Sequence, residues 1–190
     1  MRSFTAGVPM EKCLSDSLGP LLKTASENLY ILLMVDQFTK WVEAAPIPDQ
    51  SAETVARAAI DYLFLRFGCP REIFTDQGAN FTSQLFTQHC EMLEVAKKPT
   101  TPYHPSANGQ VERLNRTLLQ MIWCTIRNGQ NNWDSQLQML MAAVRCTTNH
   151  STDFNPNRLT LGREVIQPLQ LMMGVAKEQA PLQVFVEQVQ

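Results

Sequence analysis

The order of predicted strands and helices indicates an α/β fold, in which a five-stranded mixed sheet carries helices on both faces. The segment Tyr30–Val35 is a strongly apolar run, as expected for a buried strand. Residues 51–67 and 133–149 instead place their apolar side chains at helical spacing. The full order is strand–strand–strand–helix–strand–helix–strand–helix–helix, and this alternation favours a sheet covered on both sides.

Three strands are predicted near the N-terminus. The first is Cys13–Leu18, which ends at Gly19-Pro20. The second is the apolar run at 30–35, and the third, Trp41–Ala45, returns beside it after a turn at 36–40. These three segments predict one side of the sheet.

Helices and short strands alternate in the rest of the chain. Ser51 is the predicted N-cap of the helix at 51–67, and Gly68 with Pro70 ends it. The two prolines within 100–108 predict a loop. The other predicted elements are strands at 72–74 and 95–98 and helices at 83–93, 109–128 and 133–149.

The length of 190 residues fits one domain with short extensions. Residues 1–10 are predicted to be an irregular lead-in, 11–170 a single core, and 171–190 a C-terminal tail. Five cysteines form no C-x-x-C pair and three histidines are scattered, which argues against a zinc site or a disulfide framework. The longest apolar run is far too short to span a membrane, so we expect no membrane association.

The charge balance is slightly acidic. Sixteen Lys and Arg residues against 18 Asp and Glu give a net charge of −2, whereas nucleic-acid binders are usually basic. Any affinity for DNA must therefore come from a local basic surface, from bound metal, or from other parts of a larger protein.

Two acidic residues lie in distinctive surroundings. Asp76 follows a predicted strand within Phe74–Phe81, and Glu112 opens a predicted helix within Thr101–Arg116. Thirty-five residues separate the two carboxylates. That spacing alone means little, because 18 acidic residues form roughly 150 pairs and chance matches are expected.

With their surroundings, these segments resemble the catalytic core of retroviral and Gypsy-type LTR-retrotransposon integrases, which has Asp, Asp and Glu with 35 residues between the last two. Met10–Pro20 resembles the first strand of that family and places the first carboxylate at Asp16. Residues 35–45 and 157–164 are also similar to Gypsy-type sequences, so the resemblance covers about residues 7–173. It implies a ribonuclease H-like fold.

The resemblance implies a polynucleotidyl transferase that processes and joins the ends of retroelement DNA. Asp16, Asp76 and Glu112 would then hold two Mg²⁺ or Mn²⁺ ions, with Asp16 bridging both. Magnesium prefers oxygen ligands in octahedral geometry. Two ions about 3.5–4 Å apart can hold both the attacking and the leaving oxygen of an in-line displacement.

The resemblance also implies contacts with DNA and with further copies of the chain. Asn80, Tyr103, Asn108 and Arg116 are the candidate DNA contacts. Arg116 could instead pair with Glu112 four residues earlier on the helix, and asparagine in a loop is common without any ligand. A homodimer or higher oligomer through the helices at 51–67 and 133–149 is expected, as is a nuclear location, although no targeting signal is evident in the sequence.

Several departures from the family leave a second hypothesis open. Ser15 and Ser17 flank Asp16, where apolar residues are usual. Three later positions also differ: Val144 replaces a common tyrosine, Asp153 a common glycine, and Asn155 a small residue. Neither the zinc domain nor the C-terminal DNA-binding domain of the family is visible. The alternative is a non-catalytic integrase remnant that binds nucleic acid or protein, and enzymatic activity therefore stays uncertain.

Overall fold

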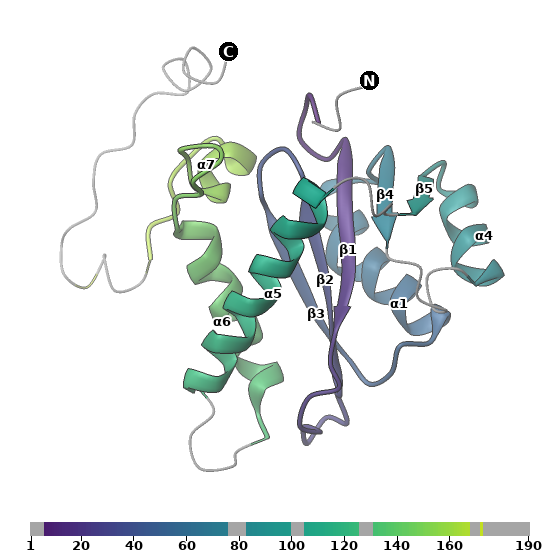
Figure 1. Ribbon diagram of the computed structural model, residues 1–190, viewed down its shortest axis with the longest axis horizontal. Helices are drawn as coiled ribbons and strands as arrows, with labels where there is room; N and C mark the ends of the chain where they lie inside the picture. The colour runs from purple at the N-terminus through teal and green to yellow at the C-terminus, as the bar shows by residue number, and fades with distance from the viewer. Residues whose placement is uncertain (1–5, 76–82, 100–104, 126–130, 168–171, 173–190) are drawn as a thin grey trace.

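A computed structural model describes residues 6–75, 83–99, 105–125, 131–167 and 172. Five strands form one mixed sheet in the order β3-β2-β1-β4-β5 (Figure 1). The strands are β1 (Lys12–Leu18), β2 (Tyr30–Asp36), β3 (Val42–Ile47), β4 (Glu72–Thr75) and β5 (Ala96–Pro99). This sheet confirms the predicted fold class.

Helices cover both faces of the sheet. The helices are α1 (Ala52–Ala59), continued by a π-helical turn η1 (Ile60–Phe64) into α2 (Leu65–Phe67), then α4 (Gln84–Met92), α5 (Pro105–Thr125), α6 (Trp133–Cys146) and α7 (Pro156–Leu161). Helices α1 and α4 lie on one side, and α5 and α6 lie side by side on the other (Figure 1). No helix in the described ranges is long and apolar enough to cross a lipid bilayer.

Strand β1 lies at the centre of the sheet. It pairs antiparallel with β2, with Leu14 opposite Val35, and parallel with β4, with Ser15 opposite Thr75. A parallel pair needs a crossover connection, which the helical segment from α1 to α2 supplies. The carboxyl ends of β1 and β4 consequently meet at the same edge of the sheet.

Alternation along the strands divides the apolar residues between two cores. Cys13 packs with α1 and α4, whereas the next residue, Leu14, packs with α5 and α6. The stripe predicted on the first helix is buried at Val55, Ala58 and Leu63. On the opposite face Leu118, Ile122, Trp133, Leu137 and Met141 are fully buried.

Two helix starts follow from capping side chains. Ser51 is the N-cap of α1, as predicted, and its hydroxyl accepts a hydrogen bond from the Thr54 amide at 3.3 Å. Ser83 caps α4 in the same way through the Phe86 amide at 3.2 Å. Gly68, with a φ of 84°, ends α2 in a conformation that suits glycine.

Two predicted helix boundaries differ from the structure, and one helix was not predicted. Helix α5 begins at Pro105, because proline has no amide hydrogen to lose in a first turn; Asn108 is therefore helical and not in a loop. Helix α6 stops at Cys146, where Thr147 turns extended. The short helix α7 was not predicted: Asn155 caps it by accepting from the Arg158 amide at 2.9 Å.

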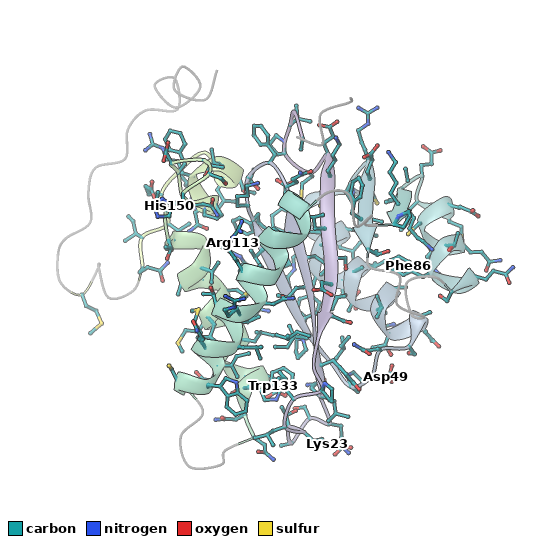
Figure 2. The ribbon with its side chains drawn as sticks, viewed as in Figure 1. Lys23, Asp49, Phe86, Arg113, Trp133 and His150 are labelled. Atoms are coloured by element: carbon teal, nitrogen blue, oxygen red, sulfur yellow. The ribbon has the colours of Figure 1, made fainter. Side chains whose placement is uncertain are left out.

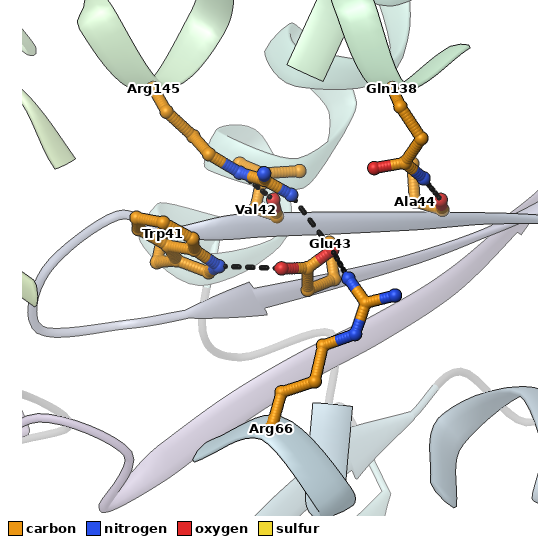
Figure 3. A network of polar contacts seen from close by, with 7 residues as sticks. All are labelled: Trp41, Val42, Glu43, Ala44, Arg66, Gln138 and Arg145. Atoms are coloured by element: carbon orange, nitrogen blue, oxygen red, sulfur yellow. Dashed lines mark hydrogen bonds and ion pairs between the residues drawn. The ribbon is translucent and has the colours of Figure 1, made fainter. Parts of the chain in front are cut away.

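A buried carboxylate joins the edge strand β3 to helices on both faces (Figure 3). Glu43 is 1% exposed and accepts a hydrogen bond from the Trp41 indole at 2.9 Å. Its other oxygen lies 2.7 Å from Arg145 of α6 and 3.6 Å from Arg66 of α2. The contact with Arg145 is an ion pair whose angles fall outside hydrogen-bond geometry. A buried charge requires such partners, so this network fixes both helices against β3.

Candidate active site at Asp16

Asp16 lies on β1, on the face of the sheet that packs against α5 and α6. Leu14, two residues earlier on the same face, belongs to that core. The carboxylate is half-buried and accepts two hydrogen bonds, from the Ser17 amide at 2.8 Å and from Asn115 Nδ2 at 2.7 Å. Asp16 therefore has a fixed orientation toward α5, as an active-site carboxylate requires.

Asn115 on α5 is a site residue that the sequence analysis did not single out. Its amide nitrogen must face Asp16, because only that end of the side chain donates. The amide oxygen, Oδ1, is then buried and makes no hydrogen bond to any residue that the structure describes. The sequence spacing could have indicated Asn115 as a site residue. It follows Glu112 by three residues, and residues three apart lie on the same face of a helix.

The second predicted carboxylate, Asp76, lies outside the described residues. The strand before it is described, however, and Thr75 pairs with Ser15 in the parallel ladder. Asp16 directly follows Ser15 in the sequence, and position 76 directly follows Thr75, the residue paired with Ser15. This register is what a site shared by Asp16 and Asp76 requires.

The third predicted carboxylate, Glu112, is placed by its backbone only. Position 112 lies on α5, one turn before Asn115, and its side chain is outside the described atoms. The side chain of Asn108 is outside them as well, and Asn80 and Tyr103 lie in undescribed segments. Arg116 is described and exposed on α5. The predicted DNA contacts and the alternative Glu112–Arg116 ion pair therefore stay predictions.

The serines beside Asp16 lie on the opposite face of β1, as strand alternation predicts. Ser15 is 5% exposed, and the Ser17 hydroxyl accepts a hydrogen bond from Gln50 Nε2 at 2.7 Å. A partnered hydroxyl avoids most of the cost of burial. Ser17 is accordingly accommodated by the structure and does not disturb the carboxylate face.

The donor atoms at Asp16 fit a hard divalent cation. A carboxylate and the nearby amide oxygen of Asn115 are the oxygen ligands that Mg²⁺ and Mn²⁺ prefer. Among the described residues no group of three acidic, histidine or cysteine side chains comes together, since Asp16 is the one described member of the predicted triad.

The order of the strands in the mixed sheet and the helices on both of its faces agree with a ribonuclease H-like fold, and two solved structures support this assignment. The structure is similar to the crystallised catalytic core of the bovine immunodeficiency virus (BIV) integrase, with a TM-score of 0.63 and 21% identity, over 80% of this chain and 95% of that one. It is also similar to a chain of the simian T-cell lymphotropic virus intasome in complex with PP2A regulatory subunit B56 gamma. That match has a TM-score of 0.68 and 19% identity and covers 82% of this chain and 56% of the other.

The family follows from sequence comparison. Residues 9–105, just over half of the chain, match the model of the integrase core domain, and the chain belongs to this family. It is 30% identical over 153 residues to the retrovirus-related Pol polyprotein from transposon 412 of Drosophila melanogaster. It is 33% identical over 152 residues to the Gag-Pol polyprotein of avian reticuloendotheliosis virus. In each case the match covers 80% of this chain and 12% of the polyprotein.

The integrase core family functions in DNA integration, and membership in this family links the chain to that general role. Integrase cores generally use divalent metals, which agrees with the oxygen donors at Asp16. The details of catalysis, substrate and assembly belong to the proposal that follows.

Proposed function

We propose that this chain is the catalytic core of a polynucleotidyl transferase that processes and joins retroelement DNA ends. The observation that carries the proposal is the half-buried Asp16 carboxylate, which Asn115 holds one residue beyond the last β1–β4 pair, Ser15 with Thr75. An ordinary surface aspartate would not need a side chain 99 residues away in the sequence to orient it.

Asp16, Asp76 and Glu112 are the proposed ligands of two Mg²⁺ or Mn²⁺ ions. Such ions would neutralise charge on the phosphoryl group and on the attacking and leaving oxygens. The contribution of the chain is positioning: Asn115 holds one oxygen of Asp16, and the Ser17 amide holds the other. Neither donor carries a charge that would compete with a metal for the carboxylate.

DNA is the proposed substrate, and a nuclear location follows from that role. Arg113 and Arg116 are both exposed on α5, on the helix that carries Glu112 and Asn115. Arg116, the residue after Asn115, supplies a local cation near the proposed centre, which a chain of net charge −2 needs in order to attract phosphate. Asn80, Tyr103, Asn108 and Arg116 are the proposed DNA contacts.

A homodimer is the proposed assembly unit, through the helical segment from α1 to α2 and through α6. Leu65 on α2 is 75% exposed and Met139 on α6 is 59% exposed. Both helices are bound to the same edge strand through Glu43 (Figure 3). Each is a large exposed apolar side chain on one of the two helices that flank the edge strand β3, and exposed apolar groups of this kind favour a protein contact over solvent.

The test is phosphoryl transfer on a preassembled branched DNA with Mg²⁺ or Mn²⁺, where proximity is already supplied. We expect detectable transfer by the unmodified chain and none by Asp16→Asn, Asp76→Asn or Glu112→Gln. Asp61→Asn, an exposed acid on η1, is the matched control and should keep full activity. If the unmodified chain shows no transfer, the non-catalytic remnant is the better description.

A further inference from the structure

A groove lies between α5 and the segment that runs from the end of α6 to the start of α7. It encloses about 480 Å³, a volume in the usual range of ligand sites. Its floor is apolar, built from Val35 and Val42 of the sheet and from Val144 of α6. Figure 2 shows Arg113 on α5 and His150 on the facing segment, on opposite sides of this groove.

The rim of the groove carries two basic side chains, Lys40 and Arg113, and one histidine, His150. No acidic residue occurs among the described residues that line the groove. Arg113 and His150 are exposed, so both are available to a ligand. Burial lowers the pKa of Lys40 and the Asp36 carboxylate opposes this effect, so Arg113 is the stronger charge. This local charge is opposite in sign to the net charge of the chain.

The groove is separate from the candidate active site. Arg113, Thr117 and Met121 follow one another at four-residue spacing and line one side of α5. Asn115, which contacts Asp16, points to a different side of the same helix. A molecule in the groove therefore need not displace any group that touches Asp16.

Val144 is one of the apolar residues that line the groove. The family resemblance leads one to expect tyrosine at this position, and valine is much smaller. Val144 is half-buried and packs at the border of the core formed with α5 and α6. A tyrosine at this lining position would place a larger side chain in the groove than valine does.

We propose that this groove is a docking site for a segment of a partner protein that carries apolar side chains flanked by carboxylates. The apolar floor would take the apolar side chain, Arg113 and Lys40 would pair with the carboxylates, and the N–H group of the His150 ring would donate a hydrogen bond. A DNA backbone matches this surface less well, because phosphate gains nothing from an apolar floor. A second copy of the chain has a separate apolar surface at Leu65 and Met139.

The proposal is tested with the full chain and a fluorescein-labelled octapeptide, Gly-Glu-Asp-Leu-Phe-Glu-Asp-Gly, by fluorescence anisotropy. We expect saturable binding that is lost when Leu and Phe are replaced by Ser, and lost when the four acids are replaced by Lys. Arg113→Glu should weaken binding at least roughly tenfold, which corresponds to about 1.4 kcal/mol. Arg57→Glu, the same charge change on exposed α1, should leave the affinity within about twofold.

Two groove variants separate docking from general charge attraction. Val144→Tyr should fill the floor and abolish binding, and its thermal unfolding shows whether the fold is retained. Thr117→Glu, at an exposed position on the same wall, should weaken binding even if Val144→Tyr does not fold. Absence of saturable binding, equal effects of Arg113→Glu and Arg57→Glu, or binding of a duplex oligonucleotide in place of the peptide would each overturn the proposal. So would groove variants that shift only the monomer–dimer equilibrium.

Discussion

The hydrogen bond from Asn115 to Asp16 joins residues 99 positions apart and orients the carboxylate on which the proposed function depends. Truncation to Asn115→Ala removes the hydrogen bond to Asp16 Oδ2 and so weakens the restraint on the orientation of this carboxylate. A hydrogen bond to a charged group contributes about 1.5–3 kcal/mol. If that energy supports transfer, the rate should fall roughly 10–100-fold.

The measurement for Asn115→Ala is the transfer rate on branched DNA across a range of Mn²⁺ concentrations. A loss that extra Mn²⁺ partly restores indicates a role in holding Asp16. Gln120→Ala, an exposed position on the same helix, is the control and should keep the parent rate. An unchanged rate in Asn115→Ala would show that the contact only supports packing.

Asp153 occupies a backbone conformation with a φ of 58°, which explains the glycine expected there. Left-handed backbone costs an L-residue about 1–2 kcal/mol, and glycine loses about 0.5–1 kcal/mol more chain entropy on folding. The strain is larger, so Asp153→Gly should stabilise the protein by about 0.5–1 kcal/mol in urea unfolding. Asp153→Ala keeps the strain and should give no gain; a gain of equal size would point to the lost charge.

At the scale of single residues, the sequence predicted which positions carry functional or capping side chains better than it predicted the partners that those side chains contact. The polar character of Ser17 is matched by Gln50, and the amide of Asn155 by the start of α7. The Gln50 partner of Ser17 could not be predicted, because that bond depends on where separate segments meet in space. The Asn155 bond is local, because its acceptor and the Arg158 amide are only three residues apart. The position of Asp16 was predicted from resemblance, whereas its contact with Asn115 required the packing of α5 on β1.

Among the secondary-structure elements, α6 is tied to the β1–β2 connection through Asp134. Its carboxylate accepts hydrogen bonds from Thr24 Oγ1 at 2.7 Å and Asn28 Nδ2 at 3.0 Å. Burial acts to raise the pKa of Asp134, but the bonds from Asn28 and Thr24 outweigh it and hold the pKa below its ordinary value of 3.8. The charged form is therefore the one that the fold stabilises.

This lowered pKa predicts a pH-dependent contribution to stability. The contribution is fully present above the ordinary pKa of 3.8 and is lost as pH falls through the lower folded value. Asp134→Asn should cost about 1–2 kcal/mol at pH 7 from weakened hydrogen bonds. Urea midpoints of parent and variant should converge below pH 3.8. A difference that stays constant from pH 7 to pH 3 would rule out the ionised carboxylate as its cause.

The ends of helices could be predicted where a capping side chain or a glycine marks them. They could not be predicted where tertiary packing determines the end of the helix. Ser51 and Gly68 define the start and end of the first helical segment, and both were predicted. The π-helical turn Ile60–Phe64 inside it has no sequence signal of this kind. The end of α6 at Cys146 also depends on tertiary contacts, since Asn157 and Gln167 donate to its sulfur.

At the scale of the whole molecule, the exposed Leu65 and Met139 predict self-association. Leu65→Glu and Met139→Glu should each weaken the dimer at least roughly tenfold, about 1.4 kcal/mol, because each places a charge in an apolar contact. Sedimentation equilibrium measures the effect. Leu161→Glu, which replaces an exposed leucine on α7, is the control and should leave the equilibrium unchanged. A monomeric parent chain at high micromolar concentration would contradict the proposed assembly.

The central place of β1 also determines the order in which the molecule can assemble from the unfolded chain. Strands β1, β2 and β3 are consecutive and antiparallel, so their pairing closes only short loops. The pairing of Ser15 with Thr75 must close a loop of some 60 residues, and the Asp16–Asn115 bond a longer one. Long-range pairings of this kind form slowly. We therefore expect the meander to appear early in synthesis, while the carboxylate site stays unformed until α5 has been translated and docked.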